Sequence, residues 1–247
     1  DHSFRVIEAF RVKFQISILG LPAVIDLQHM VGEFVFLDLL RIFEHRNLVD
    51  PVFELAQVVQ MGAPKSSREV FSLVGNILWF NVYERLLRYN PDTDEFHHFR
   101  HRPDDPTSLS GDQVWALLEA SDGALWVGTY GGGLNRLDTR TGHVHRYRHD
   151  PQDPRSLSSD RVLTVFRDSQ GMLWVGTEDG GLNSLDSNSE SFTRYTHEPA
   201  NPNSLSHDAA WLITETSDGS LWVGTNGGGL NRFDENTQTF TRYQHEA

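Results

Sequence analysis

The sequence predicts an all-β fold, a partial β-propeller of about three and a half four-stranded antiparallel blades, and three observations support this prediction. Residues 103–150, 151–198 and 199–247 align without a gap at a period of 48 residues. Each block contains four short β-rich segments separated by glycine or proline turns. Because one twisted four-stranded sheet cannot bury both of its faces alone, a period of this length indicates blades packed around an axis.

The first block shows the expected strands in order. Residues 112–120 (DQVWALLEA) are apolar and rich in β formers, and a Ser-Asp-Gly turn leads into 124–130 (ALWVGTY). A Gly-Gly-Gly turn precedes 134–140 (LNRLDTR), and 143–149 (HVHRYRH) alternates with the period of a half-exposed strand. The first hairpin places a glycine where a two-residue turn needs a positive φ. After the fourth strand, a proline-spaced connector ends in Ser-Leu-Ser and is expected to cross to the next blade.

Residues 71–102 are expected to form a degenerate half-blade. The stretch from Ile77 to His101 aligns with the second, third and fourth strands of the first block if one residue is dropped near Glu84. Its Trp79 lies 47 residues before Trp126, although the Gly-Gly-Gly turn is lost. Three and a half blades fall short of the roughly four to eight of closed propellers. We therefore expect an open arc with exposed apolar surface on the last blade.

Residues 1–70 differ in kind and are left unassigned. They contain 3 of the 20 glycines and 7 of the 15 phenylalanines, but no tryptophan or threonine. Residues 30–48 and 51–60 have patterns compatible with amphipathic helices, which would give this segment a mixed α/β structure. Three interpretations remain open: a separate small domain, blades that have decayed beyond recognition, or sequence that is not native to the protein, such as a misjoined or wrong-frame translation.

The composition excludes several classes of partner. A formal net charge of -13 argues against a nucleic-acid or anionic-membrane surface, because such surfaces need clustered Lys and Arg. The chain has no cysteine, which excludes disulfides, thiolate catalysis and sulfur-ligated zinc. The longest apolar run, 16–25, is about half the ~20 residues of a membrane span. No signal peptide is visible, so membrane attachment is expected only through flanking segments.

The repeated string resembles a known family. The pattern LWVGT-x-x-GGLN-x-[LF]D occurs at 125–138, 173–186 and 221–234 and resembles the two-component regulator propeller repeat. Only the second copy departs, with Glu178 and Asp179 ahead of its glycines. The resemblance implies a fragment of a periplasmic, extracytoplasmic sensor module that is found ahead of a transmembrane segment and a histidine kinase, or in other proteins a diguanylate cyclase. It also implies that further blades and the output domain lie outside this chain.

Catalytic, cofactor and metal sites are not expected. The glycine turns open strands rather than helices and lack a following Lys-Ser/Thr, which argues against a phosphate cradle. The repeat-equivalent His149, His197 and His245 lie on the outermost strands, too far apart to share a metal, so a solvated or capping role is expected. Asp138 and its equivalents are expected to bond their own turn backbone. No Ser-His-Asp order, HExxH helix or carboxylate pair stands out.

The best candidate for a binding site is the end of the axis where the crossover connectors and the turns between second and third strands meet. The position after LWVGT varies among the blades, as Tyr130, Glu178 and Asn226, while its surroundings repeat. This variation suits a recognition surface, although drift at an exposed turn would look the same. The predicted face consists of Asp112, Trp115, Tyr130, Asp160, Arg161, Glu178, Asp179, Asp208, Trp211 and Asn226.

The residues of the predicted face favour ligand binding over catalysis. Aromatic rings beside carboxylates and amides suit a carbohydrate or another small ligand, and the resemblance points the same way. We expect a ligand-sensing module that signals through changes in packing or through homodimerisation. The alternatives are the sensor of a diguanylate cyclase, a structural protein-interaction propeller, and a propeller lyase, which would need a histidine or acid pair converging on the axis.

Overall fold

The computed structural model describes residues 14–18, 21–25, 71–74, 77–81, 85–90, 92–93 and 95–244. The chain divides into two compact units, residues 1–61 and 62–247. In the first unit, β1 (Phe14–Ile18) and β2 (Leu21–Ile25) form an antiparallel hairpin. The helices expected at 30–48 and 51–60 lie outside the described residues.

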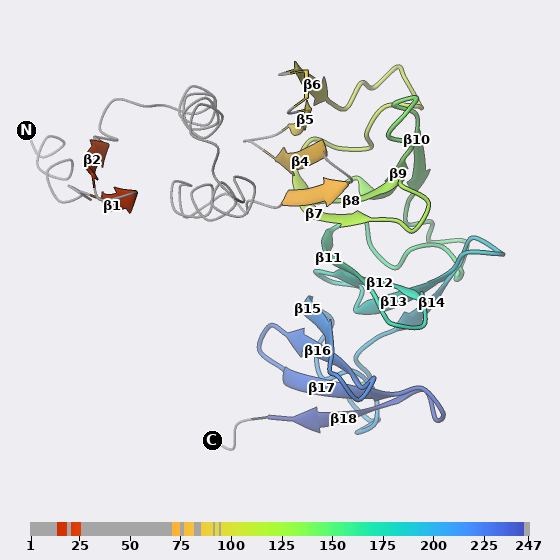
Figure 1. The fold of residues 1–247 in the computed structure, drawn as a ribbon. Helices are drawn as coiled ribbons and strands as arrows, with labels where there is room; N and C mark the ends of the chain where they lie inside the picture. Colours follow the sequence, from red (N-terminus) through yellow and green to blue (C-terminus); the bar gives the residue numbers. More distant parts are fainter. Residues whose placement is uncertain are drawn as a thin grey trace, which may run out of the picture. The chain divides into compact units, whose positions relative to one another are not determined.

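The second unit consists of four four-stranded antiparallel sheets, which we call the first to fourth blades (Figure 1). The first blade contains β3 (Phe71–Val74), β4 (Ile77–Asn81), β5 (Leu86–Asn90) and β6 (Glu95–Phe99). The second contains β7 (Val114–Glu119), β8 (Leu125–Thr129), β9 (Gly133–Leu137) and β10 (Val144–Tyr147). The third contains β11 (Val162–Arg167), β12 (Leu173–Thr177), β13 (Leu182–Asp186) and β14 (Ser191–Tyr195). The fourth contains β15 (Ala210–Glu215), β16 (Leu221–Thr225), β17 (Gly229–Asp234) and β18 (Thr239–Tyr243).

The predicted all-β partial propeller is confirmed, but the first blade has more strands than the sequence indicated. Strand β3 pairs antiparallel with β4 and completes a four-stranded sheet where half a blade was expected. Its residues, Phe-Ser-Leu-Val, do not resemble the first strand of the later blades, so the repeat pattern could not reveal it. The unit therefore contains four sheets rather than three and a half.

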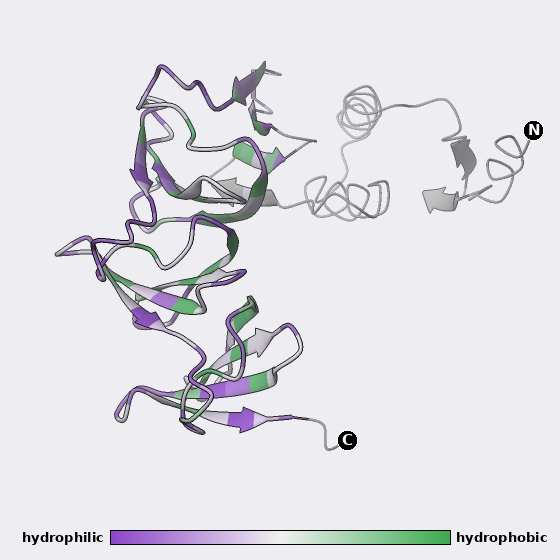
Figure 2. Ribbon diagram, turned by 180° about the vertical axis from the view of Figure 1, so that it is seen from behind, coloured by the Kyte–Doolittle hydropathy of each residue, from purple (hydrophilic) through white to green (hydrophobic). Residues whose placement is uncertain are grey.

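Neighbouring blades pack through their first strands and through apolar layers between the sheets. Strands β3, β7, β11 and β15 contact one another in succession, which makes them the inner strands of the arc. Figures 1 and 2 show the blades in a row, with hydrophobic residues along the strands and hydrophilic residues in the loops. Trp126 (8% exposed) and Trp174 (3%) belong to the core, in the layers that face the third and fourth blades.

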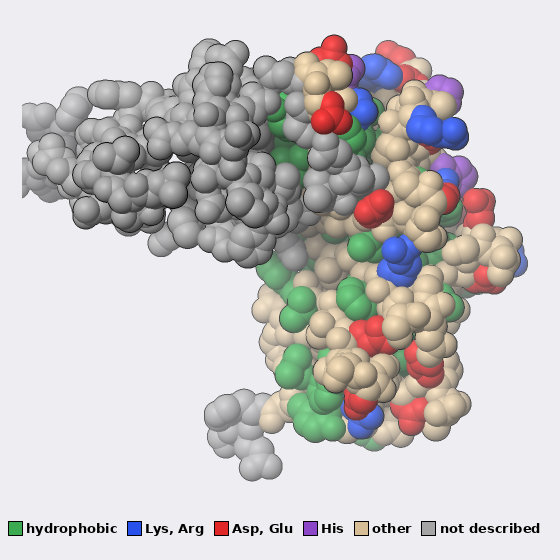
Figure 3. Space-filling model, in the orientation of Figure 1, with side chains coloured by type: hydrophobic (Ala, Val, Ile, Leu, Met, Phe, Trp, Pro, Cys, Tyr) green, Lys and Arg blue, Asp and Glu red, His purple; other side chains and the backbone are tan. Residues whose placement is uncertain are grey.

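The outer face of the fourth blade exposes apolar side chains, as predicted for an open arc. Leu134 and Leu182 are fully buried by the blade that follows each of them, whereas the equivalent Leu230 is 47% exposed. Leu212 and Tyr243 are exposed on the same blade. Figure 3 shows hydrophobic side chains gathered over this end of the unit. Among the described residues, no further blade covers this apolar face of the fourth blade.

The crossover connectors are held by an arginine in the outer strand of the second, third and fourth blades. The guanidinium of Arg194 donates to the carbonyl oxygens of Asp153 (2.8 Å), Ser156 (2.9 Å) and Leu157 (3.3 Å) and to the Ser156 hydroxyl (2.7 Å). The same four bonds recur at Arg146 and Arg242. Proline-spaced segments without strand partners are thereby fixed, and they carry the residues that begin the next blade.

Aspartates at the turns bond the local backbone, as the sequence indicated. Asp138 accepts hydrogen bonds from the amides of Arg140 (2.9 Å) and Thr141 (3.1 Å). These bonds hold the pKa of the Asp138 carboxyl below its usual value. Asp105, in the connector before the second blade, accepts from the Thr107 hydroxyl (2.6 Å) and amide (2.9 Å). Together with Arg102, these donors lower the pKa of Asp105 from 3.8 to about 2.

This shift predicts a loss of stability in acid that the substitution Asp105→Asn would remove. A depressed pKa in the folded state stabilises the fold above the unfolded value, so this contribution is lost as the pH falls from about 4 to about 2. Urea unfolding over this range should show a smaller pH dependence for Asp105→Asn than for the wild type. The control is Asp104→Asn, because the Asp104 carboxylate has no hydrogen bond among the described residues. Equal pH dependence in all three proteins would contradict the prediction.

Candidate functional site

Aspartate carboxylates bond one end of each connector loop to the other, and these loops carry residues of the predicted face. The carboxylate of Asp160 accepts a hydrogen bond from the His149 amide (2.8 Å), and the His149 ring nitrogen Nδ1 lies 2.9 Å from the Leu157 carbonyl oxygen. The same pair of contacts recurs twice, at His101 with Asp112 and Leu109, and at His197 with Asp208 and Leu205. His149 and His197 therefore cap loops, as expected, and His245 lies outside the described residues. No metal-binding group of three or more His, Asp or Glu occurs within the described ranges.

The connector of one blade is also bonded to the glycine turn of the blade before it. The carbonyl oxygen of Asp160 accepts from the amides of Gly131 (2.9 Å) and Gly133 (2.8 Å), and that of Asp208 accepts from Gly181 (2.8 Å). Gly133 has a φ of 84°, and a Cβ there would lie 2.3 Å from the Tyr147 carbonyl oxygen, so this position requires glycine. The structure thus gives Asp112, Asp160 and Asp208 a positioning role, and their contact with a ligand stays a prediction.

Five of the predicted residues come together across the second and third blades, and we call them the axial cluster: Trp115, Tyr130, Arg161, Glu178 and Asp179. The rings of Trp115 and Tyr130 stack with their centroids 4.8 Å apart. The Tyr130 hydroxyl donates to Glu178 Oε2 at 2.5 Å. The guanidinium of Arg161 lies 5.9 Å from the Tyr130 ring centroid and bonds Glu178 (3.3 Å) and Asp179 (3.2 Å). The variable position of the repeat is therefore the centre of a polar and aromatic network.

A β-bulge in the inner strand of the second, third and fourth blades positions the side chains at this end. The register shifts between Val114 and Ala116 in β7, and at the equivalent positions of β11 and β15. The bulged residues are Trp115, Leu163 and Trp211. Bulges re-aim side chains and are common next to functional sites. Trp115 and Trp211 meet edge to face with their centroids 6.4 Å apart, so Trp211, which is 40% exposed, extends the cluster toward the fourth blade.

The electrostatics of the cluster keep Tyr130 protonated. Its hydrogen bond to Glu178 and, to a lesser degree, burial raise the pKa of the Tyr130 phenol above 10. The phenol therefore remains a donor to the carboxylate at neutral pH, while Arg161 offsets part of the negative charge of Glu178 and Asp179. The arrangement offers an aromatic face, two carboxylates and a guanidinium at one surface, which can bind a polar ring compound through stacking and hydrogen bonds.

Asn226, a predicted residue, takes no part in the cluster or in the loops beside it, and one set of residues was missed. Asn226 occupies the variable position of the fourth blade, and its amide donates to the Ala209 carbonyl oxygen (2.9 Å). Its side chain is exposed and has no hydrogen bond within the described part of the chain. The missed residues are fully buried asparagines, Asn135, Asn183 and Asn231, which bond the connectors. Their recurrence at the same repeat position was the signal that could have revealed them.

Comparison with protein-family models matches three segments of the chain, 108–131, 156–179 and 204–227, to the family described as two component regulator propeller. Each segment begins in a crossover connector and ends in the turn after the second strand of a blade. These segments are two-component regulator propeller repeats. The resemblance seen in the sequence is thus confirmed, and the repeats contain all ten residues of the predicted face. No curated protein matches the chain.

Solved structures support the same fold. The extracellular domain of the hybrid two-component system BT3049 from B. thetaiotaomicron is 25% identical with a TM-score of 0.62, and the match covers 76% of this chain and 26% of that one. The matched part of this chain therefore spans about a quarter of that domain. A virginiamycin B lyase from Staphylococcus aureus (14% identity, TM-score 0.52, 74% and 58% covered) and the WD40 β-propeller domain of Doa1 (18%, 0.50, 74% and 53%) share the fold alone.

Proposed function

We propose that this chain is the ligand-sensing part of a bacterial signal-transduction receptor of the two-component sensor-kinase type, and that it binds its ligand without changing it chemically. The observation that carries the proposal is the axial cluster. A stacked Trp115–Tyr130 pair, a carboxylate and a guanidinium meet at a variable position of the repeated scaffold. Residues that vary on a rigid scaffold are suited to recognition.

The BT3049 domain supports the receptor context. That protein is the extracellular domain of a hybrid two-component system, and at 25% identity the likeness extends along 76% of this chain. We infer an extracytoplasmic location and a histidine kinase or, as the alternative, a diguanylate cyclase as the output. No helix in the described part of the chain is long and apolar enough to cross a membrane.

A carbohydrate suits the axial cluster in shape and polarity. A sugar ring can lay its C–H face on the exposed ring of Trp211, while its hydroxyl groups donate to Glu178 and Asp179. Because the Tyr130–Glu178 hydrogen bond joins the second blade to the third, a ligand that competes for Glu178 would alter the packing between two blades. Such a change could be passed on through blade packing or through a homodimer.

A thermal-shift panel of neutral mono- and oligosaccharides tests this function. A ligand that binds only the folded chain should raise the midpoint progressively with its concentration. The double variant Tyr130→Phe/Glu178→Gln should weaken binding at least tenfold, because a hydrogen bond to a charged group is worth about 1.5 to 3 kcal/mol. Asn226→Ala, at the equivalent position of the fourth blade, is the matched control and should bind normally.

Two outcomes would overturn the proposal. If no sugar raises the midpoint, or if the double variant binds as the wild type does, the axial cluster is structural and an interaction propeller becomes the better interpretation. If the chain cleaves a polysaccharide and loses that activity when Glu178 or Asp208 is replaced, the chain is a lyase.

A further inference from the structure

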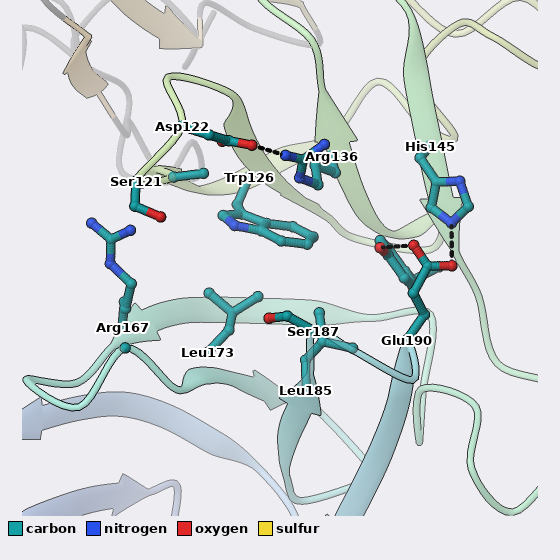
Figure 4. Close-up of a pocket in the computed structure, with 13 residues that line it drawn as sticks. Ser121, Asp122, Trp126, Arg136, His145, Arg167, Leu173, Leu185, Ser187 and Glu190 are labelled. Carbon is teal, nitrogen blue, oxygen red and sulfur yellow. Dashed lines mark hydrogen bonds and ion pairs between the residues drawn. The ribbon is translucent and has the colours of Figure 1, made fainter.

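A cleft of about 410 Å³ opens between the second and third blades, at the end of the blades opposite the axial cluster (Figure 4). It lies beside the turns that join first to second and third to fourth strands. Trp126, Leu173 and Leu185 supply its apolar walls, and Ser121, Arg136 and Arg167 are among its polar lining. The predicted face does not include this region.

The equivalent space between the third and fourth blades offers a comparison for these positions. There the indole N–H of Trp174 donates to the Asp168 carboxylate at 2.7 Å. The amide and hydroxyl of Ser169 donate to the Glu215 carboxylate at 2.8 and 2.7 Å. Phe233 fills the space beside Trp174, with ring centroids 5.2 Å apart. In that interface the chain satisfies its own donors with two carboxylates.

Between the second and third blades, both carboxylates are replaced. Ala120 stands at the repeat position of Asp168, and Arg167 stands at that of Glu215. The smaller Leu185 takes the place of Phe233. The Trp126 indole N–H, Ser121 and the Arg167 guanidinium consequently have no hydrogen-bond or ion-pair partner in the part of the chain that the structure describes. Figure 4 shows Ser121, Arg167 and the nitrogen edge of Trp126 on the same side of the cleft.

The remaining charges in the cleft are already paired. Arg136 bonds the Asp122 carboxylate and lies over the Trp126 ring. Glu190 lies 3.9 Å from His145 and accepts a hydrogen bond from the Tyr147 hydroxyl at 3.4 Å. Among the described residues that line the cleft, Arg167 is therefore the one whose charge has no counterion. A cation with two neutral donors beside it is best satisfied by an anion that accepts several hydrogen bonds, such as a carboxylate.

We propose that this cleft binds small molecules that carry one carboxylate on a flat, apolar body. The carboxylate accepts hydrogen bonds from Trp126 Nε1, Ser121 and Arg167, in place of the Asp168 and Glu215 carboxylates of the next interface. The apolar body lies along the open mouth of the cleft, against the small exposed edges of Trp126 and Leu173, because these two side chains and Leu185 already pack together in one buried cluster. This site is separate from the sugar site proposed above, since it lies at the other end of the blades and selects an anion rather than a neutral sugar.

Benzoate is a suitable probe, and the indole N–H resonances of the six tryptophans provide the readout. Titrating the intact chain should shift the Trp126 resonance, identified by its loss in Trp126→Phe, until saturation. The Trp174 resonance should not shift, because the Trp174 indole N–H already donates a hydrogen bond to the Asp168 carboxylate. Benzyl alcohol, which has the same ring without the charge, should cause no comparable shift.

Two variants and one control complete the test. Arg167→Gln should weaken benzoate binding at least tenfold, because it removes the charge of a charge-assisted bond. Ala120→Asp should supply an internal carboxylate, move the Trp126 resonance toward that of Trp174 and abolish benzoate binding. Arg140→Gln is the control. The Arg140 side chain is 88% exposed on the second blade, which also carries Trp126, so this variant should bind benzoate normally.

The proposal is overturned if benzoate leaves the Trp126 resonance unmoved, if it moves Trp174 equally, or if Arg167→Gln binds as tightly as the wild type. Sugar binding at the axial cluster is measured separately in the same samples, so failure at one site does not count against the other.

Discussion

Replacing Gly176 by alanine should lower the free energy of unfolding by about 1 to 3 kcal/mol, whereas the same change at Gly224 should be neutral or slightly stabilising. Both glycines occupy the same position of the LWVGT segment. A Cβ on Gly176 would lie 2.5 Å from the Ala210 carbonyl oxygen and 2.7 Å from Thr164 Cγ2. At Gly224 the nearest atom would be Leu212 Cβ at 3.4 Å, an ordinary contact.

The difference arises from the neighbouring blade. Strand β15 packs against β12, so the backbone of the fourth blade cannot withdraw from Gly176 without opening the interface. Urea unfolding of the two single variants, measured side by side, would test this prediction. Destabilisation of both variants within about 0.5 kcal/mol of each other would show that blade packing does not explain the glycine.

Replacing Asn183 by alanine should lower the free energy of unfolding by about 2 to 4 kcal/mol, because several buried groups would lose their partners together. The Asn183 side chain is fully buried and accepts from the Ser158 amide at 3.0 Å. It also donates to the Ser158 hydroxyl (2.8 Å) and to the Val175 carbonyl oxygen (3.3 Å). The Val175 carbonyl would remain buried without this bond, and the half-buried Ser158 amide would lose its acceptor.

The control for Asn183→Ala is Asn226→Ala, whose exposed side chain should cost less than about 0.5 kcal/mol. Hydrogen exchange gives a second readout, since the Ser158 amide should lose protection before the strands of the third blade do. If Asn183→Ala unfolds at the same urea concentration as Asn226→Ala, water must replace the lost bonds and the buried network is not a source of stability.

The repeated strands and turns could be predicted because their signals are local. A Gly at a hairpin position or an alternating strand depends on residues a few positions away, and three copies in register reinforce each signal. Strand β3 lacked such a signal, since its four residues do not follow the repeat. The structural roles of Asn183 and Arg194 could not be predicted from the sequence for a different reason. Their partners lie 25 and 38 residues away, so recurrence showed the residues but not their bonds.

The candidate site was predicted in part. The variable position identified Tyr130 and Glu178, which lie 48 residues apart and meet because neighbouring blades bring equivalent turns together. Asp112, Asp160 and Asp208 were selected for their place at the same end, but their carboxylates close the connectors. The cleft near Trp126 was missed. Its signal was also variation, at Ala120 and Arg167, but the meaning of these changes depends on the hydrogen bonds of the next interface.

The bonds between the glycine turns and the following connectors make each blade a link in a linear array. Asp160 holds the turn at Gly131 and Gly133, and Asp208 holds the turn at Gly181, so each turn is secured by the blade that comes after it. In such an array, stability is a sum of units and their interfaces, and unfolding can propagate from an end. Tension applied at the carboxyl end of the unit should therefore unzip the fourth blade first and free the turn at Gly181 before the one at Gly131.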